Sequence, residues 1–110
     1  MDCLAHRAKM VREWRSWINK VVEVVKELFP DAEVYLIGSV AEGRAVGASD
    51  VDLLVVSSRV PTRPREIAEV KVIIEEKAGL PPYSPLEIHF ALPEEKERYL
   101  AWSKHHIRLA

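Results

Sequence analysis

The run from Val51 to Val56 constrains the fold of this chain more than any other feature. It consists of Val and Leu with a single Asp at position 52, and β-branched and aliphatic side chains of this kind favour a strand. Side chains alternate between the two faces of a sheet, and here both faces are apolar along most of the run. We therefore expect residues 50–56 to form a central strand that is buried on both sides.

The rest of the chain supplies elements to surround such a strand. Apolar residues recur at helical spacing over residues 2–28, and Pro30 ends this predicted helix. The repeating positions are Leu4, Val11, Trp14, Ile18, Val21, Val25 and Leu28. Two further strands are expected at residues 33–37 and 86–90. The order of elements predicts a mixed α/β domain that spans residues 1–110.

Three more helices are expected. A short one begins at Ser39 and runs to Glu42, and a last one starts at Pro93 and reaches about His105. A long one covers residues 65–78. Its inward face would comprise Ile67, Val70, either Ile73 or Ile74, Lys77 and Ala78.

Composition excludes several classes of protein. Sixteen Lys and Arg against seventeen Asp and Glu give a net charge of -1, so bulk charge does not argue for nucleic-acid binding. No apolar run approaches the roughly twenty residues that cross a bilayer, and residues 1–7 lack the apolar core of a secretion signal. The single Cys3 forms no internal disulfide or thiolate metal site, so we expect a cytoplasmic protein. The lack of Gln and the abundance of charge are typical of thermophiles.

Gly38 and Ser39 follow the first expected strand and begin the short helix. A glycine allows a sharp turn and the close approach of a ligand, because it carries no side chain. The backbone amides at the start of a helix, together with the Ser39 hydroxyl, suit a phosphate. The sequence therefore predicts a phosphate-binding turn, although most Gly-Ser pairs after a strand are ordinary turns.

Asp50 and Asp52 stand at the start of the central strand and project from the same face, because strand side chains alternate. Two carboxylates so close repel one another unless a cation lies between them. Oxygen ligands of this kind favour Mg²⁺, which completes its shell with phosphate oxygens and water. The alternative is that the two acids are solvated or cap a turn.

The turn and the acid pair together resemble a known family. The stretch from Gly38 to Gly43, then residues 44–48, then Ser49-Asp50-Val51-Asp52-Leu53 is similar to the signature of the minimal nucleotidyltransferases of the DNA polymerase beta-type superfamily. The resemblance implies a small mixed palm-type sheet covered by helices on one side. It also implies two Mg²⁺ ions, with Mn²⁺ as an alternative, and ATP or another nucleoside triphosphate as substrate.

The same resemblance implies the role of each residue in the motif. Gly38, Ser39, Gly43 and Ser49 would bind the nucleotide, and Asp50 and Asp52 would bind the metals and act in catalysis. The family also needs a third carboxylate on a later strand.

Glu87 is the acid available for that third place, with His89 on the same strand face as its partner. The chain also departs from the family at Glu42, where an Arg is common; Glu42 would face away or pair with Arg44. These departures support an alternative, in which the protein is an inactive nucleotide-binding or interaction module of the same fold.

The acceptor is expected to be small or to be presented by another protein, since little chain remains to grip a polymer. Small free-standing members of the family resemble antitoxins paired with a HEPN-type partner, some of which transfer AMP to that partner. Nucleic acid is not expected without a partner, no membrane is expected, and a homo-oligomer is left open. A third interpretation is an antibiotic-type nucleotidyltransferase. For His105 and His106 we expect a solvated helix end rather than a metal site.

Overall fold

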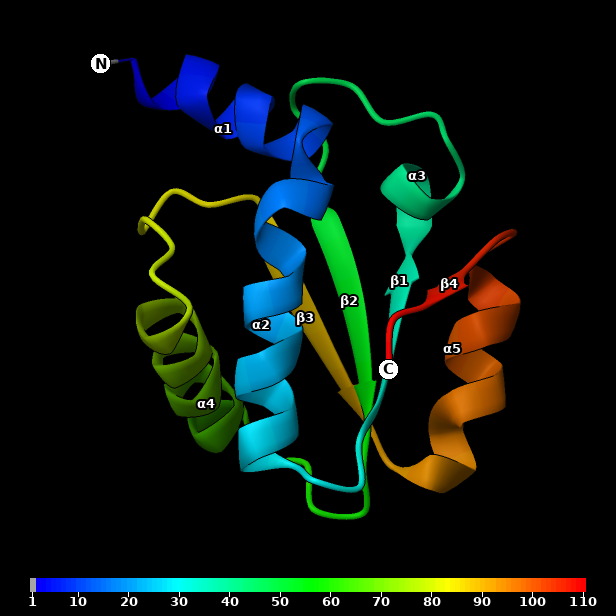
Figure 1. Ribbon diagram of the computed structural model, residues 1–110. Coiled ribbons are helices and arrows are strands. Elements are labelled where there is room, and N and C mark those ends of the chain that lie inside the picture. The colour runs from blue at the N-terminus through cyan, green and yellow to red at the C-terminus, as the bar shows by residue number, and fades with distance from the viewer. Residues whose placement is uncertain (1) are drawn as a thin grey trace.

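A four-stranded sheet forms the centre of the molecule in this computed structural model, which describes residues 2–110 (Figure 1). Met1, the first residue of the predicted domain, lies outside the described residues. The strands are β1 (Glu33–Ile37), β2 (Val51–Val56), β3 (Leu86–Ala91) and β4 (Ile107–Arg108), in the order β3-β2-β1-β4. β1 runs antiparallel to β2 and β4, whereas β2 and β3 are parallel. The mixed α/β class is confirmed.

β2 is the buried central strand that its apolar sequence predicts. Leu53 and Val55 pack on one face of the sheet, and Leu54 and Val56 pack on the other. All four are buried, because both faces of this strand are covered by helices. Asp52 is the polar interruption, and it lies at the strand end where the candidate site forms.

The predicted single helix over residues 2–28 is wrong, because two helices occupy that segment. α1 (Cys3–Arg12) and α2 (Trp14–Leu28) meet at Glu13, whose backbone leaves the helical region at φ −103° and ψ 32°. Ser16 stabilises this turn, since both its amide and its hydroxyl donate to the Glu13 carbonyl oxygen. The bend carries α1 off the line of α2, so Leu4 is 77% exposed rather than part of the apolar face.

α2 and α4 (Pro64–Lys77) cover one face of the sheet (Figure 1). Ile18, Val21 and Val25 of α2 are buried, as their spacing predicts. In α4 the inward position is Ile74, which is fully buried, whereas Ile73 is 41% exposed.

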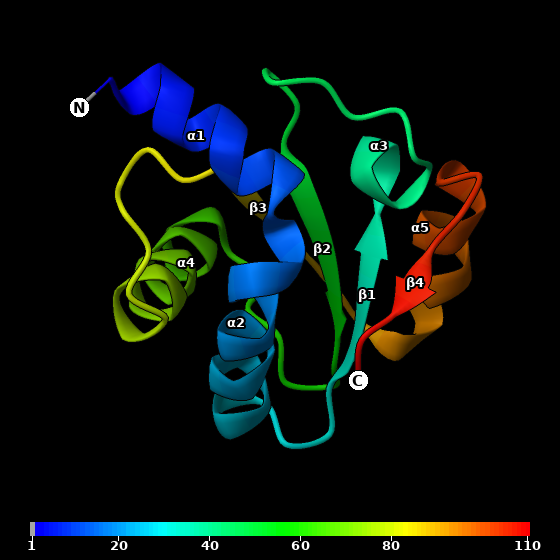
Figure 2. The same ribbon diagram turned by 45° about the horizontal axis from the view of Figure 1, so that its top comes forward.

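Helices were expected on one side of the sheet only. The last helix lies on the opposite side, so both sides are covered (Figure 2). A turn of 3-10 helix (Pro93–Glu95) leads into α5 (Lys96–Trp102). Tyr99 and Leu100 pack against the apolar side chains of Tyr35, Ile37, Leu54, Val56 and Ala91. This layer is thinner than the α2–α4 layer, and it borders the candidate site.

The last helix is also shorter than predicted, because it ends at Trp102 instead of near His105. Ser103 is buried and extended, and its hydroxyl donates to the His105 carbonyl oxygen. The chain then turns back and adds β4 to the free edge of β1, pairing Tyr35 with Arg108. His105 and His106, which were expected at a helix end, therefore lie in the connection between α5 and β4.

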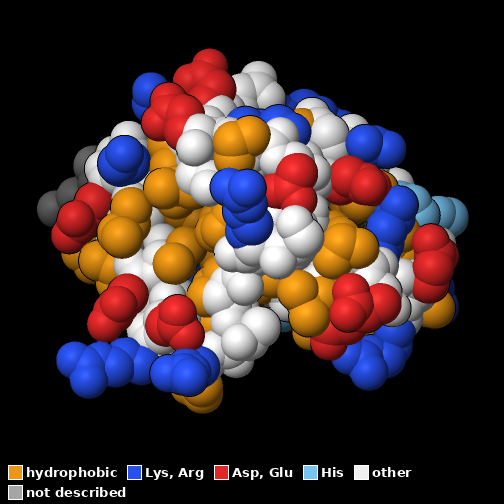
Figure 3. Space-filling view, turned by 90° about the horizontal axis from the view of Figure 1, so that it is seen from below, with side chains coloured by type: hydrophobic (Ala, Val, Ile, Leu, Met, Phe, Trp, Pro, Cys, Tyr) orange, Lys and Arg blue, Asp and Glu red, His pale blue; other side chains and the backbone are white. Residues whose placement is uncertain are grey.

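None of the helices in the described part of the chain combines the length and apolarity needed to cross a bilayer. Acidic and basic side chains are interspersed on the lower end of the molecule (Figure 3). That end shows no single-signed charged surface, in keeping with the balanced net charge.

Candidate active site

Gly38 forms a sharp turn between β1 and the short helix α3 (Gly38–Ala41). Its φ of +75° lies in the left-handed region that favours glycine. A Cβ atom at this position would lie 2.6 Å from Oδ2 of Asp52, so a side chain is excluded by contact as well. The Gly38 amide donates to the buried Ser103 hydroxyl at 3.0 Å, which fixes the turn from the end of α5.

Asp52 lies beside this turn because β1 and β2 pair Ile37 with Asp52. Its side chain is only 16% exposed. The Nε2 atom of His89 on β3 is 3.1 Å from Asp52 Oδ1. His89 was expected beside Glu87, and the structure instead brings its ring to the aspartate of the neighbouring strand.

Asp50 immediately precedes β2, and its side chain is 56% exposed. Arg7 of α1 holds it, with 2.7 Å between Nη2 and Asp50 Oδ1. The same guanidinium donates to the Ser49 carbonyl oxygen at 3.1 Å. Arg7 thus fixes the start of β2 from a helix more than forty residues earlier in the chain.

The loop between α3 and β2 contains the two other predicted nucleotide-binding residues. The Ser49 hydroxyl accepts a hydrogen bond from the Val46 amide at 2.9 Å, so it shapes the loop. Gly43 has a φ of +74°, but no atom lies within 4 Å of where its Cβ would be. Ser39 is half-buried in the first turn of α3.

Glu87 is the register partner of Asp52 across the parallel β2–β3 pair. The two residues therefore project from the same face of the sheet. The Glu87 carboxylate, however, is 3.1 Å from Nζ of Lys71 on α4. β3 is an edge strand, and its side chains can reach the helix that flanks this edge.

A further carboxylate, that of Glu75 on α4, is near enough to Glu87 for the two charges to interact. Burial, and next the negative charge of Glu87, raise the pKa of Glu75 above its ordinary value. Within residues 2–110 no three His, Cys, Asp or Glu side chains come close enough to hold a metal ion together. The structure thus brings the two aspartates and Glu87 to one end of the sheet without converging their carboxylates.

Each of these three acids is instead matched with one basic side chain. Asp50 pairs with Arg7, Asp52 with His89 and Glu87 with Lys71. Neighbouring carboxylates repel, and the positive charges of Arg7 and Lys71 offset that repulsion.

Sequence reasoning missed Arg7 and Lys71. Both lie on helices remote from the motif, and nothing in their local sequence marks them.

The expectation for Glu42 is confirmed. Its carboxylate pairs with Arg44, with 3.2 Å between Oε1 and Nε. The side chain is only 8% exposed. A negative charge is therefore neutralised before it can oppose an anionic ligand.

His105, His106, Cys3 and two tryptophans lie outside the site. His105 and His106 are exposed, and the His106 ring packs edge-on against Tyr35. Trp14 is buried, and Trp17 donates through Nε1 to the Met10 carbonyl oxygen. Cys3 is a free, exposed thiol on α1.

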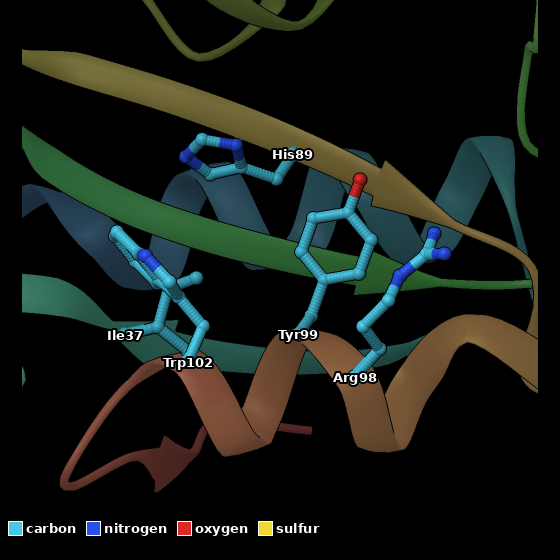
Figure 4. Close-up of a pocket in the computed structure, with 5 residues that line it drawn as sticks. All are labelled: Ile37, His89, Arg98, Tyr99 and Trp102. Atoms are coloured by element: carbon cyan, nitrogen blue, oxygen red, sulfur yellow. The ribbon is translucent and has the colours of Figure 1, made fainter.

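A pocket opens beside Asp52, between α5 and the sheet (Figure 4). Its volume is about 280 Å³, and its walls are Ile37, His89, Arg98, Tyr99 and Trp102. The Tyr99 ring points from α5 toward β3, and Trp102 lies next to Ile37 (Figure 4).

Comparison with known proteins identifies the family. The model of the nucleotidyltransferase domain family matches residues 18–108. One solved crystal structure, described as that of a candidate nucleotidyltransferase, is 31% identical, with 84% of this chain and 97% of that chain covered and a TM-score of 0.64. Another, from Sulfolobus solfataricus and described in the same way, is 22% identical over 98% of this chain and 86% of that chain. Its TM-score of 0.53 shows a shared fold.

No curated protein matched the chain. The family model nevertheless spans the sheet, the Gly38 turn and all three acids of the site. The chain therefore belongs to the nucleotidyltransferase domain family.

Proposed function

We propose that the protein is a Mg²⁺-dependent nucleotidyltransferase that transfers AMP from ATP to an acceptor hydroxyl. Membership of the family supports nucleotidyl transfer in general. The observation that carries the proposal is the contact between Asp52 and the Gly38 turn. A carboxylate lies directly against a turn that excludes any side chain, with Asp50 two residues before it.

The donor set fits Mg²⁺, which prefers carboxylate oxygens and tolerates few protein ligands. Asp50 and Asp52 would hold the metal, and Glu87 would join them once its carboxylate leaves Lys71. Bound divalent ions lower the pKa of an attacking hydroxyl and neutralise the charge of departing pyrophosphate.

Different residues of the chain would then position the phosphates and the carboxylates. The Gly38–Ser39 turn receives phosphate oxygens without steric conflict, and His89 orients the Asp52 carboxylate. The acceptor oxygen attacks the α-phosphorus, the bond to pyrophosphate breaks, and Glu87 takes the acceptor proton. Such transfer depends on positioning and charge neutralisation more than on covalent catalysis.

The decisive experiment is calorimetric titration with ATP, with and without Mg²⁺. We expect Mg²⁺-dependent binding that is lost in Asp52→Asn. Glu27→Gln, at an exposed site near the end of α2, serves as the control for loss of one carboxylate. Metal-independent binding, or unchanged binding in Asp52→Asn, would count against the proposal.

The acceptor in this proposal is a hydroxyl on a HEPN-type protein partner, in an antitoxin role. Its support is the resemblance of the motif to small free-standing members of the family. The purified partner is mixed with the protein, Mg²⁺ and ATP labelled at the α-phosphate. We expect label on the partner, and label on no partner tested would remove this part of the proposal.

The alternative is an inactive nucleotide-binding module of the same fold. The Lys71–Glu87 ion pair favours it, since it holds the third acid away from the aspartates. Release of pyrophosphate in the presence of the acceptor distinguishes the two. ATP binding without any pyrophosphate release indicates the module.

A further inference from the structure

We propose that the pocket between α5 and the sheet binds the base of the nucleoside triphosphate. The inference rests on the proposed function, because it assigns the part of the substrate that the phosphate turn and the aspartates leave unbound. It concerns the described pocket of about 280 Å³ lined by Ile37, His89, Arg98, Tyr99 and Trp102 (Figure 4).

The pocket touches both halves of the candidate site. Ile37 directly precedes Gly38, and Trp102 directly precedes Ser103. The Ser103 hydroxyl accepts a hydrogen bond from the Gly38 amide. On the other side, His89 lies 3.1 Å from Asp52. A group attached to phosphates at the Gly38 turn can therefore enter the pocket without crossing the sheet.

The walls of the pocket suit a flat heterocycle. Two aromatic rings, Tyr99 and Trp102, come from successive turns of α5, and Ile37 and the His89 ring complete an apolar surface from the sheet. No acidic side chain lines it. Bases stack on aromatic rings irrespective of their identity, because every base presents a π-face.

The size of the pocket favours one small group over a polymer. Small-molecule sites range from about 300 to 1,000 Å³, and this pocket lies just below that range. One wall is unusually open, since Trp102 is 68% exposed although it is a large aromatic residue. A stacked base would cover this ring.

Titrations with three ligands distinguish binding in the base pocket from binding at the phosphate site. Titrations of the full chain in Mg²⁺ use ATP, inorganic tripolyphosphate and adenosine. We expect ATP to bind about tenfold more tightly than tripolyphosphate, which corresponds to one stacked base. Trp102→Ala should remove this tenfold advantage and leave tripolyphosphate binding unchanged.

Tryptophan fluorescence gives an independent readout. ATP should quench the emission in the wild type, and tripolyphosphate should not. Trp17→Phe, on α2 and away from the pocket, should keep the quenching, and Trp102→Phe should lose it. Tyr99→Leu keeps an apolar side chain on the sheet. It should also weaken the binding of ATP and leave the binding of tripolyphosphate unchanged.

The outcomes distinguish this inference from the proposed function. If ATP and tripolyphosphate bind equally and Trp102→Ala changes neither, the base pocket is wrong and the phosphate site stands. Should neither ligand bind, the proposed function itself fails. If Trp102→Ala weakens the binding of ATP and of tripolyphosphate equally, Trp102 has a structural role, and the inference is overturned.

Discussion

At the scale of single residues, the site consists of acids held by bases from other elements. Asp50, Asp52 and Glu87 stand at one end of the sheet, and each has a basic partner. The Glu87–Lys71 pair is partly exposed, and it determines whether a third carboxylate is free. Exposed ion pairs contribute about 0.2–1 kcal/mol, so a divalent ion can displace Lys71.

Replacing Lys71 tests this competition. We expect Lys71→Met to strengthen Mn²⁺ binding roughly twofold to fivefold, since it removes an ion pair of that strength. Calorimetry or the spectrum of bound Mn²⁺ measures the effect. Lys77→Met, at an exposed position on the same helix, controls for loss of a positive charge.

The gain from Lys71→Met must also depend on Glu87. In a Glu87→Gln background, the same substitution should have no effect on Mn²⁺ affinity. A gain that persists there would show that Glu87 is not a ligand.

Gly38 offers a second test at this scale. Gly38→Ala should destabilise the protein by about 1–3 kcal/mol, because the residue has positive φ and a Cβ would meet Asp52. Gly79 has a similar φ of +71° with no atom within 4 Å of its Cβ position, so Gly79→Ala isolates the backbone strain. Urea unfolding measures both.

The affinity for Mg²⁺ should also distinguish the two glycine variants. Gly38→Ala should weaken Mg²⁺ affinity by displacing the Asp52 carboxylate, and Gly79→Ala should leave it unchanged. Equal metal affinity in the two variants would contradict the described contact.

At the scale of elements, α1 is a helix whose direction and contacts its sequence did not reveal. It precedes the family match at residues 18–108, yet it supplies Arg7 to Asp50. The apolar spacing predicted helix correctly on both sides of Glu13 but could not show the bend. Glu is a good helix former, and the bend depends on local backbone hydrogen bonds and on packing against the sheet.

Arg7 should fasten α1 to the loop before β2. In Arg7→Met we expect faster amide hydrogen exchange in residues 3–12, because an ion pair and a hydrogen bond to Ser49 are lost. Exchange in α2 should not change. Lys9→Met, exposed on the same helix, provides the matched comparison, and equal exchange in both variants would refute the role of Arg7.

Local sequence predicted the elements, and nonlocal contacts explain what it missed. The central strand, Gly38, Asp50 and Asp52 could be anticipated because their signals all lie in the continuous stretch of residues 38–56. β4 could not, since two residues become a strand only by pairing with β1. The direction of the Glu87 carboxylate was equally hidden, because Lys71 reaches it from another element.

At the scale of the whole molecule, an ion pair joins the α5 layer to the sheet. Lys96 at the start of α5 lies 2.8 Å from Glu33 on β1. Hydrogen bonds from Lys96 and then Tyr35 lower the pKa of Glu33 below its ordinary value of 4.5. The same pairing raises the pKa of Lys96.

These shifts predict how stability depends on pH. Glu33 has a lower pKa in the folded state, so the unfolded state binds more protons as the pH falls. Its stabilising contribution is present above about pH 4.5 and is lost at lower pH. Lys96 has the opposite sign, and its contribution is lost only at strongly alkaline pH.

Glu33→Gln should therefore lower the Tm by a few degrees at pH 7 and by less at pH 3. Thermal unfolding across this range measures the difference. For Glu97→Gln, at an exposed site on α5, the Tm difference from the wild type should not shrink between pH 7 and pH 3. A constant difference at all pH values would exclude titration of Glu33 as the cause.

The hydrogen bond from the Gly38 amide to Ser103 has a consequence for synthesis. It joins residues 65 positions apart, so the early turn gains its fixed shape only from a late part of the polypeptide. Ribosomes deliver these segments several seconds apart at about 5–20 residues per second. While Ser103 is still inside the exit tunnel, the glycine turn has emerged but lacks this hydrogen bond. We therefore expect the turn to reach its final shape only after residue 103 has left the ribosome.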